Sequence, residues 1–176
     1  MITLICGPMY SGKTTEMIRR LERAYYAKKK VIVVRPKTDT RGFLSHSSKN
    51  VSWLTQTYVS SLVTVNLDEF DYIGIDEGQF HKGLKEFCKK YSSKNIIISA
   101  LHATSECEMF DQIIDIIPYC DKILKLNAVC TQCGSEHANY TYYLAGNKKD
   151  KVAVGGSESY TALCYSCYNK NIKGEE

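Results

Sequence analysis

The most informative stretch of this sequence covers residues 2–14 and reads ITLICGPMYSGKT. Residues 2–6 form a short apolar, β-rich run, which predicts a buried strand. Downstream, Met17, Ile18, Leu21 and Ala24 recur at three- and four-residue spacing, which predicts an amphipathic helix. The residues between these elements match G-x-x-x-x-G-K-[ST], with the strand before and the helix after that the motif requires. Residues 2–25 therefore predict a strand, a phosphate-binding loop and a helix.

The loop carries groups suited to phosphate and to a metal ion. Its glycines let successive backbone N–H groups curl around phosphate oxygens, and the start of the helix adds the positive end of its dipole. Lys13 can neutralise the charge of β- and γ-phosphates, and the Thr14 hydroxyl can hold Mg²⁺. The predicted ATP- and phosphate-binding residues of this loop are Gly7, Pro8, Met9, Tyr10, Ser11, Gly12, Lys13, Thr14 and Thr15.

Further strands and helices alternate along the chain. Apolar runs predict strands at residues 31–34, 72–75, 95–100 and 123–126, with Pro36 ending the first of these, and helical spacing predicts helices at 84–91 and 110–118. The polar stretch 37–50 is typical of a long loop. Alternation of strands and helices is typical of a parallel sheet with crossover helices, so we expect an α/β fold over residues 1–127.

Two consecutive acids follow the strand at 72–75. Asp76 is suited to bind the metal ion of a nucleotide, because such an acid stands at the end of a strand neighbouring the loop. Metal binding alone does not require Glu77 beside it. A second carboxylate there can accept the proton of an attacking hydroxyl or water, so we predict that Glu77 is a catalytic base.

After Ala128 the composition changes, with more Cys, Tyr, Gly and Asn and no long helical period. Two C-x-x-C pairs are present, which together supply the four thiolates of a closed, structural Zn²⁺ site. These zinc ligands are Cys130, Cys133, Cys164 and Cys167. We predict a small second domain at 128–168, in which the metal joins the ends of a loop at 134–163, here called the lasso. The tail 169–176 is expected to be frayed.

The other cysteines and the histidines are given structural interpretations. Four cysteines are predicted to be small buried residues: Cys6, Cys88, Cys107 and Cys120. His137 lies between the two pairs but is not needed as a ligand. The remaining histidines are predicted at surfaces or loop edges: His46, His81 and His102.

Composition excludes several classes of protein. The formal net charge of +4 is too small to indicate a nucleic-acid partner. No apolar stretch approaches the roughly 20 residues that cross a bilayer, and residues 2–6 are too short for a signal peptide, so we expect no membrane partner and a cytoplasmic location. Eight cysteines in 176 residues are too few for a disulfide scaffold.

The sequence resembles the zinc-containing type II thymidine kinases over residues 2–168. The resemblance rests on residues 7–16 (GPMYSGKTTE), 37–41 (KTDTR), 75–80 (IDEGQF), 125–130 (KLNAVC), 154–156 (VGG) and 160–164 (YTALC). The string at 75–80 joined to the double C-x-x-C is highly specific, because a generic phosphate-loop ATPase does not need it.

This resemblance implies a RecA-like P-loop domain that transfers the γ-phosphate of ATP to the 5′-hydroxyl of thymidine. In such enzymes the position of Glu77 is the base, Thr14 and Asp76 serve Mg²⁺, and Asp39 and Arg41 belong to the phosphate end. The implied nucleoside-binding residues are Met9, Phe80, Leu101, Ser105, Thr141, Val152, Ala153, Val154, Gly155 and Tyr160. The family is also commonly a homotetramer that the triphosphate product, dTTP, inhibits.

Three departures from the family pattern affect the nucleoside end. Ser105 stands where phenylalanine is expected, Ser47 where an acid often follows the loop histidine, and Tyr142-Tyr143 where a basic pair is common. Loss of a buried aromatic contact costs about 0.5–1.5 kcal/mol beyond the lost area. Weaker thymidine binding or relaxed base choice is therefore expected.

Two other functions fit the motifs. A P-loop ATPase would use Glu77 to activate water and its zinc ribbon to bind a partner. A nucleotide-binding regulator would bind ATP or dTTP without phosphotransfer. ADP release that depends on added thymidine distinguishes the kinase from both.

Overall fold

A six-stranded sheet forms the centre of the protein. The computed structural model describes residues 1–39, 51–144 and 159–173. Every pair of neighbouring strands in the sheet is parallel. Their order across the sheet is β3 (Thr55–Val59), β2 (Val31–Pro36), β4 (Tyr72–Ile75), β5 (Asn95–Leu101), β1 (Ile2–Gly7) and β6 (Lys122–Lys125). The predicted α/β fold with a parallel sheet is confirmed.

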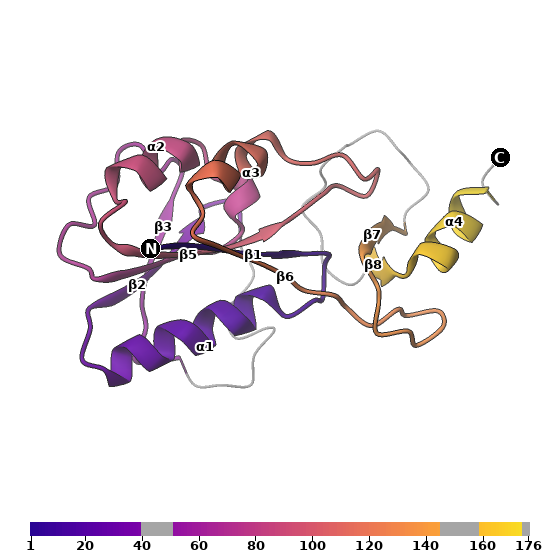
Figure 1. The fold of residues 1–176 in the computed structure, drawn as a ribbon, viewed down its shortest axis with the longest axis horizontal. Coiled ribbons are helices and arrows are strands. Elements are labelled where there is room, and N and C mark those ends of the chain that lie inside the picture. The colour runs from indigo at the N-terminus through magenta and orange to yellow at the C-terminus, as the bar shows by residue number, and fades with distance from the viewer. Residues whose placement is uncertain (40–50, 145–158, 174–176) are drawn as a thin grey trace.

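Helices cover both faces of this sheet (Figure 1). Helix α1 (Lys13–Tyr26) lies on one face, whereas α2 (Leu84–Lys90), α3 (Asp111–Ile116) and the 3-10 turn η3 (Ile117–Tyr119) lie on the other. The two faces have separate apolar clusters. Burial on both faces explains why the central strands read as continuous apolar runs rather than as alternating ones.

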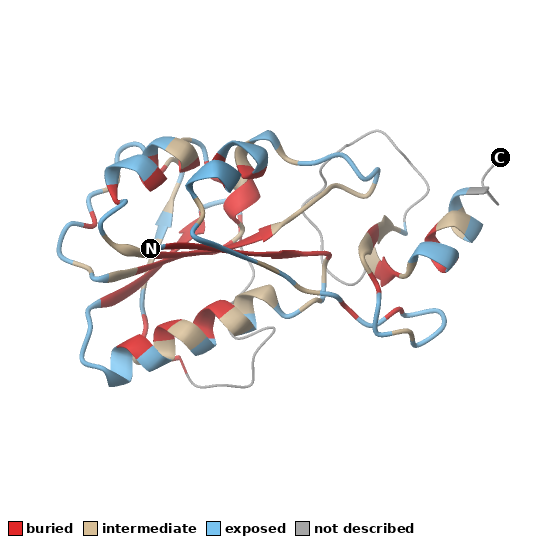
Figure 2. Ribbon diagram, viewed as in Figure 1, coloured by how far each residue is buried: buried red, intermediate tan, exposed pale blue. Residues whose placement is uncertain are grey.

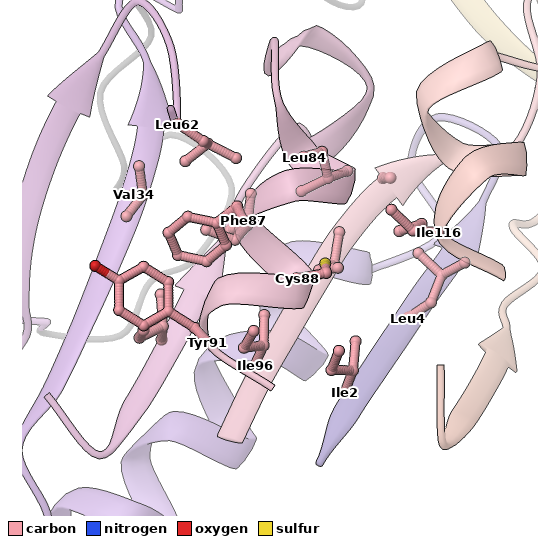
Figure 3. Packing of buried hydrophobic residues seen from close by; sticks show 14 of the residues in the cluster. Ile2, Leu4, Val34, Leu62, Leu84, Phe87, Cys88, Tyr91, Ile96 and Ile116 are labelled. Carbon is pink, nitrogen blue, oxygen red and sulfur yellow. The ribbon is translucent and has the colours of Figure 1, made fainter. Parts of the chain in front are cut away.

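Helix α1 packs through one side only. Met17, Ile18, Leu21 and Ala24 are buried against the sheet, and the opposite side is exposed (Figure 2). On the other face, the rings of Phe87 in α2 and of Tyr91 directly after it lie 4.7 Å apart between centroids (Figure 3). These two rings anchor α2 to the larger of the two clusters.

Strand β3 was not predicted, and the end of β2 was placed too early. All five residues of β3 are exposed or half-buried, so its sequence lacks the apolar run of the central strands. Pro36 is the last residue of β2 and pairs in register with Val59 of β3. The pairing of β2 with β4 ends at Val34, so Pro36 has a neighbouring strand on one side only. A residue without an N–H group is tolerated at such a position.

Residues after β6 form a second, smaller unit. Strands β7 (Tyr140–Tyr143) and β8 (Tyr160–Leu163) pair antiparallel, and helix α4 (Tyr165–Lys173) follows β8. The unit has an apolar cluster of its own, which includes Ala138, Ala162 and Tyr168. Helix α4 corrects two predictions, because a helical segment does exist here and residues 169–173 continue it rather than fray.

Two further predictions of burial were wrong. Cys107 is exposed, although Cys6 and Cys88 are buried as expected and Cys120 is half-buried. His81 is only 1% exposed, because it lies in the turn after β4 and hydrogen-bonds the backbone there. Among the described residues, no helix is long and apolar enough to cross a membrane.

Candidate active site

The glycine-rich loop leaves the carboxyl end of β1 and leads directly into α1. Gly12 precedes the helix with φ of 78°, a left-handed conformation that glycine adopts without steric cost. Its carbonyl accepts the first helical hydrogen bond, from Glu16 N at 3.0 Å. The loop therefore places the N-terminus of a 14-residue helix at the carboxyl end of the parallel strands, where it can bind phosphate.

Lys13 and Ser11 lie against the same loop. Lys13 Nζ donates to the carbonyl of Pro8 at 2.6 Å, and Ser11 Oγ donates to that carbonyl at 2.8 Å. Both side chains thus point back over the loop, which keeps the Lys13 cation close to the backbone N–H groups.

Thr14 at the start of α1 and Asp76 after β4, the two predicted magnesium residues, are in direct contact. Thr14 Oγ1 donates to Asp76 Oδ1 at 2.9 Å. Asp76 is 3% exposed, and burial together with repulsion from Glu77 raises the pKa of Asp76 to about 6. The raised pKa means that burial and the Glu77 charge disfavour the ionised carboxylate of Asp76. A nearby positive charge would therefore stabilise it.

Arg35 supplies part of that charge and was not predicted. Its guanidinium donates to Asp39 Oδ2 at 2.8 Å and to the Tyr58 hydroxyl at 3.0 Å, and its Nε lies 3.8 Å from Asp76 Oδ2. The side chains of Arg35, Asp39 and Asp76 are each 4% exposed. Asp39, which the resemblance assigns to the phosphate end, is thus linked to Asp76 through Arg35. A charged residue at the carboxyl end of an otherwise apolar strand was the sequence signal for Arg35.

Glu77 follows Asp76 in an unusual backbone conformation. Its φ and ψ are 52° and 47°, which non-glycine residues rarely adopt. The next residues, Gly78–Phe80, form the 3-10 turn η2. A Cβ on Gly78 would lie 2.7 Å from Ile98 Cγ2, so only glycine lets this turn pack against β5. The turn holds Glu77 at the carboxyl end of β4, beside Asp76.

Gln79 connects Glu77 to the neighbouring strand. Its amide nitrogen donates to Glu77 Oε2 at 2.7 Å, and its amide oxygen accepts from Leu101 N at 2.9 Å. Gln79 stands in the family string but was not predicted as a site residue.

The second unit touches the loop at two points. The backbone N–H of Met9 donates to Thr141 Oγ1 in β7 at 3.0 Å. The Tyr10 hydroxyl donates to the carbonyl of Tyr160, at the start of β8, at 3.2 Å. Four residues expected at the nucleoside and phosphate ends are therefore brought together from distant parts of the chain.

Other residues expected at the nucleoside end lie near the carboxyl end of β5. Phe80 is half-buried with its ring edge toward Phe110 at 6.4 Å between centroids. The loop that follows β5 contacts α4, because the Ser105 carbonyl accepts a hydrogen bond from the Tyr168 hydroxyl at 2.6 Å. A cavity of about 140 Å³ lies between the loop and β7, lined by His102, Ala103, Thr104, Cys107, Met109, Asn139, Tyr140 and Thr141.

The four predicted zinc ligands come together in the second unit. Their Sγ atoms all lie within 4.8 Å of one another, and Cys133 Sγ is 3.6 Å from Cys164 Sγ. Tetrahedral coordination with Zn–S bonds of about 2.3 Å requires sulfur atoms about 3.8 Å apart, so the set fits such an ion. His137 is exposed and is not part of the cluster.

Some predicted residues fall outside the described part of the chain. They are Arg41, His46 and Ser47 in the segment 40–50, and Val152, Ala153, Val154 and Gly155 in the segment 145–158.

A glycine-rich loop at a helix start, with a buried carboxylate at the carboxyl end of another strand of the same parallel sheet, is the arrangement found in α/β nucleotide-binding proteins, and the fold and the site define that class here. Comparison with known proteins narrows the class. Residues 1–168 match the family described as "Thymidine kinase", and the chain belongs to this thymidine kinase family.

Viral and mammalian relatives are similar over nearly the whole chain. The thymidine kinase of Variola virus is 36% identical over 172 residues, which are 95% of this chain and 96% of the viral protein. The vaccinia virus (strain Western Reserve) thymidine kinase gives the same figures. The Bos taurus protein "Thymidine kinase, cytosolic" is 35% identical over 179 residues, covering 99% of this chain and 74% of the bovine one.

Proposed function

We propose that this chain transfers the γ-phosphate of ATP to the 5′-hydroxyl of thymidine. The observation that carries the proposal is the position of Glu77, directly after the Asp76 that Thr14 contacts and held by Gln79, in a member of the thymidine kinase family. A nucleotide-binding protein without phosphotransfer would need the loop and Asp76 but not a second, ordered carboxylate.

The phosphate end is formed by the loop residues 7–15 together with Asp39 and Arg41. Lys13 and Arg41 would offset charge on the transferred phosphoryl group. Thr14 and Asp76 are the residues that would hold Mg²⁺ with ATP, which supplies charge neutralisation at the phosphates. The Thr14–Asp76 contact and the burial of Asp76 beside the Glu77 carboxylate support that assignment.

Glu77 is the proposed general base. Its carboxylate accepts the 5′-hydroxyl proton while the hydroxyl oxygen bonds to the γ-phosphorus of ATP, and the bond from that phosphorus to the β,γ-bridging oxygen breaks to release ADP. The products are thymidine monophosphate and ADP.

The nucleoside would lie where the second unit meets the loop. Met9, Phe80, Leu101, Ser105, Thr141 and Tyr160, with lasso residues 152–155, are the proposed contacts. The Met9–Thr141 and Tyr10–Tyr160 hydrogen bonds support a pocket at this junction. Ser105 in place of an aromatic residue favours weaker binding of thymidine or acceptance of other bases.

The second unit has a proposed structural role. Zn²⁺ bound by the four thiolates would hold residues 128–168 as a domain that carries the lasso, beside a P-loop kinase domain at 1–127. The close grouping of the Sγ atoms and the separate apolar cluster support this division.

Three further properties are proposed from family membership. They are a homotetrameric assembly, inhibition by dTTP, and a cytoplasmic location in keeping with the name of the bovine relative.

A panel of deoxynucleosides with γ-labelled ATP tests the proposal. We expect label on thymidine, and we expect Glu77→Gln to abolish turnover while ATP binding stays near normal. Glu86→Gln, at an exposed acid on α2, is the control and should keep full activity.

ADP release that does not depend on any added nucleoside would indicate an ATPase instead. ATP or dTTP binding without transfer would indicate a regulator. Full activity of Glu77→Gln would remove Glu77 from the mechanism.

A further inference from the structure

We propose that Gln79 is a positioning residue, which fixes the carboxylate of Glu77 relative to the phosphate loop. The inference rests on the proposed role of Glu77 as the base. Gln79 is 4% exposed, and its side chain contacts Glu77 directly. It acts through Glu77 rather than on the substrate.

The amide group of Gln79 is held at both ends. Its nitrogen donates to Glu77 Oε2 at 2.7 Å and its oxygen accepts from Leu101 N at 2.9 Å. Reversal of the amide would place oxygen against a carboxylate and NH₂ against an N–H group. The two partners therefore allow one orientation only, in which an N–H group always faces the Glu77 carboxylate.

Leu101 connects the Gln79–Glu77 contact to the phosphate loop. It is the last residue of β5 and pairs in register with Gly7, the last residue of β1 and the first of the phosphate loop. The chain of contacts thus runs from Glu77 through Gln79 to the strand that borders the loop. Glutamate has three side-chain torsions, and ordering them before the reaction favours a productive distance between base and phosphate.

The backbone of the turn has separate supports. In the orientation that satisfies its neighbours, the Gln112 amide nitrogen in α3 donates to the carbonyls of Gln79 and His81, at 2.8 and 3.0 Å. His81 Nε2 donates to the carbonyl of Asp76 at 3.0 Å. These bonds do not involve the Gln79 side chain, so a change in that side chain should leave the turn in place.

Gln79→Glu is the most selective test. The variant keeps the shape of the side chain and an oxygen for Leu101 N, but it replaces the N–H donor to Glu77 by a second carboxylate. We expect kcat to fall roughly 10- to 100-fold with KM values for ATP and thymidine within about twofold. Gln79→Met, which removes both polar contacts, is the second variant. Gln56→Met, on the half-buried edge strand β3, is the control and should leave kcat unchanged.

A double-mutant cycle with Glu77→Asp separates positioning from a general structural role. The shorter aspartate withdraws the carboxylate from the amide, so Gln79→Glu should then change kcat less than about threefold. Equal losses in both backgrounds, or an unchanged kcat for both Gln79 variants, would overturn the proposal. Full activity of Glu77→Asp together with Glu77→Gln would instead overturn the role of Glu77 itself. Urea unfolding of each variant identifies any loss that comes from stability.

Discussion

Arg35 makes it possible for two carboxylates to be buried at the carboxyl end of the sheet. Asp39 and Asp76 are both almost fully buried, and Arg35 contacts both from the end of β2. Burial of an uncompensated charge costs several kcal/mol, whereas a planar guanidinium can satisfy several acceptors at once. The tyrosine hydroxyl and ring of Tyr58 hold the guanidinium from a third side.

Arg35→Met should therefore destabilise the protein strongly. The substitution keeps much of the side-chain volume but leaves Asp39 and Asp76 buried without their cation, which should cost about 3–5 kcal/mol of unfolding free energy. Urea unfolding measures this cost. Arg19→Met is the matched control, because the Arg19–Glu16 pair has a similarly short contact of 2.6 Å but an Arg19 side chain that is 49% exposed.

The control should lose no more than about 1 kcal/mol, as is usual for exposed ion pairs. Similar losses for the two variants would contradict the view that burial makes Arg35 important.

The same residues show what sequence could predict at this scale. Asp76 and Glu77 were identified because two acids directly follow an apolar strand, and that signal is local. The contact of Arg35 with Asp76 depends on β2 and β4 being neighbours, which no local pattern specifies. The contact of Gln79 with Glu77 occurs within a turn in which Glu77 is in the αL conformation, and no local sequence pattern specifies that backbone.

At the scale of elements, the packing of α1 on the sheet depends on Gly74 in β4. A Cβ at Gly74 would lie 2.7 Å from Leu21 Cδ1 and 3.0 Å from Val33 Cγ2. The helix thus approaches the sheet at a strand position without a side chain. This approach brings the start of α1, with Thr14, to Asp76 two residues beyond Gly74.

Gly74→Ala should cost about 1–3 kcal/mol, because the added methyl group must displace a well-packed core residue. Leu21→Ala should cost about 2–5 kcal/mol by leaving a cavity. In the double variant the new methyl group occupies part of that cavity, so the loss should be smaller than the sum of the two. Urea unfolding of the four proteins completes the cycle, and strictly additive losses would show that Gly74 and Leu21 do not share this space.

Elements were predicted well where one apolar face or run was strong. The five strands expected in the sheet are present. Four of them, β1, β2, β4 and β5, are apolar runs because they are buried on both faces, whereas β6 is a largely exposed edge strand. Strands β3, β7 and β8 and helix α4 were not predicted, and β3 and α4 lack such a signal. β3 is an edge strand without a buried residue, and α4 is a polar helix that ends a small unit.

At the scale of the whole molecule, the second unit contacts the phosphate loop, and its described residues form only a small apolar core. It touches the phosphate loop through Met9–Thr141 and Tyr10–Tyr160. Among the residues that the structure describes, its cluster has seven buried members, of which two are the cysteines Cys130 and Cys167. Units of this size usually require a metal or disulfides to fold, so the thiolate cluster should be essential for their order.

Cys133→Ser should therefore unfold the second unit while the six-stranded sheet stays folded. Cys133 is exposed, so without a bound metal its replacement by serine would change little packing. Cys107→Ser, at another exposed cysteine, is the matched control and should keep the unit ordered.

Hydrogen exchange with mass spectrometry should show protection lost in β7, β8 and α4 but kept in β1 and β5. Metal analysis should find about one zinc per wild-type chain. A zinc chelator should reproduce the pattern in the wild type. Unchanged protection in Cys133→Ser, or equal loss in both sheets, would contradict a metal-dependent second unit.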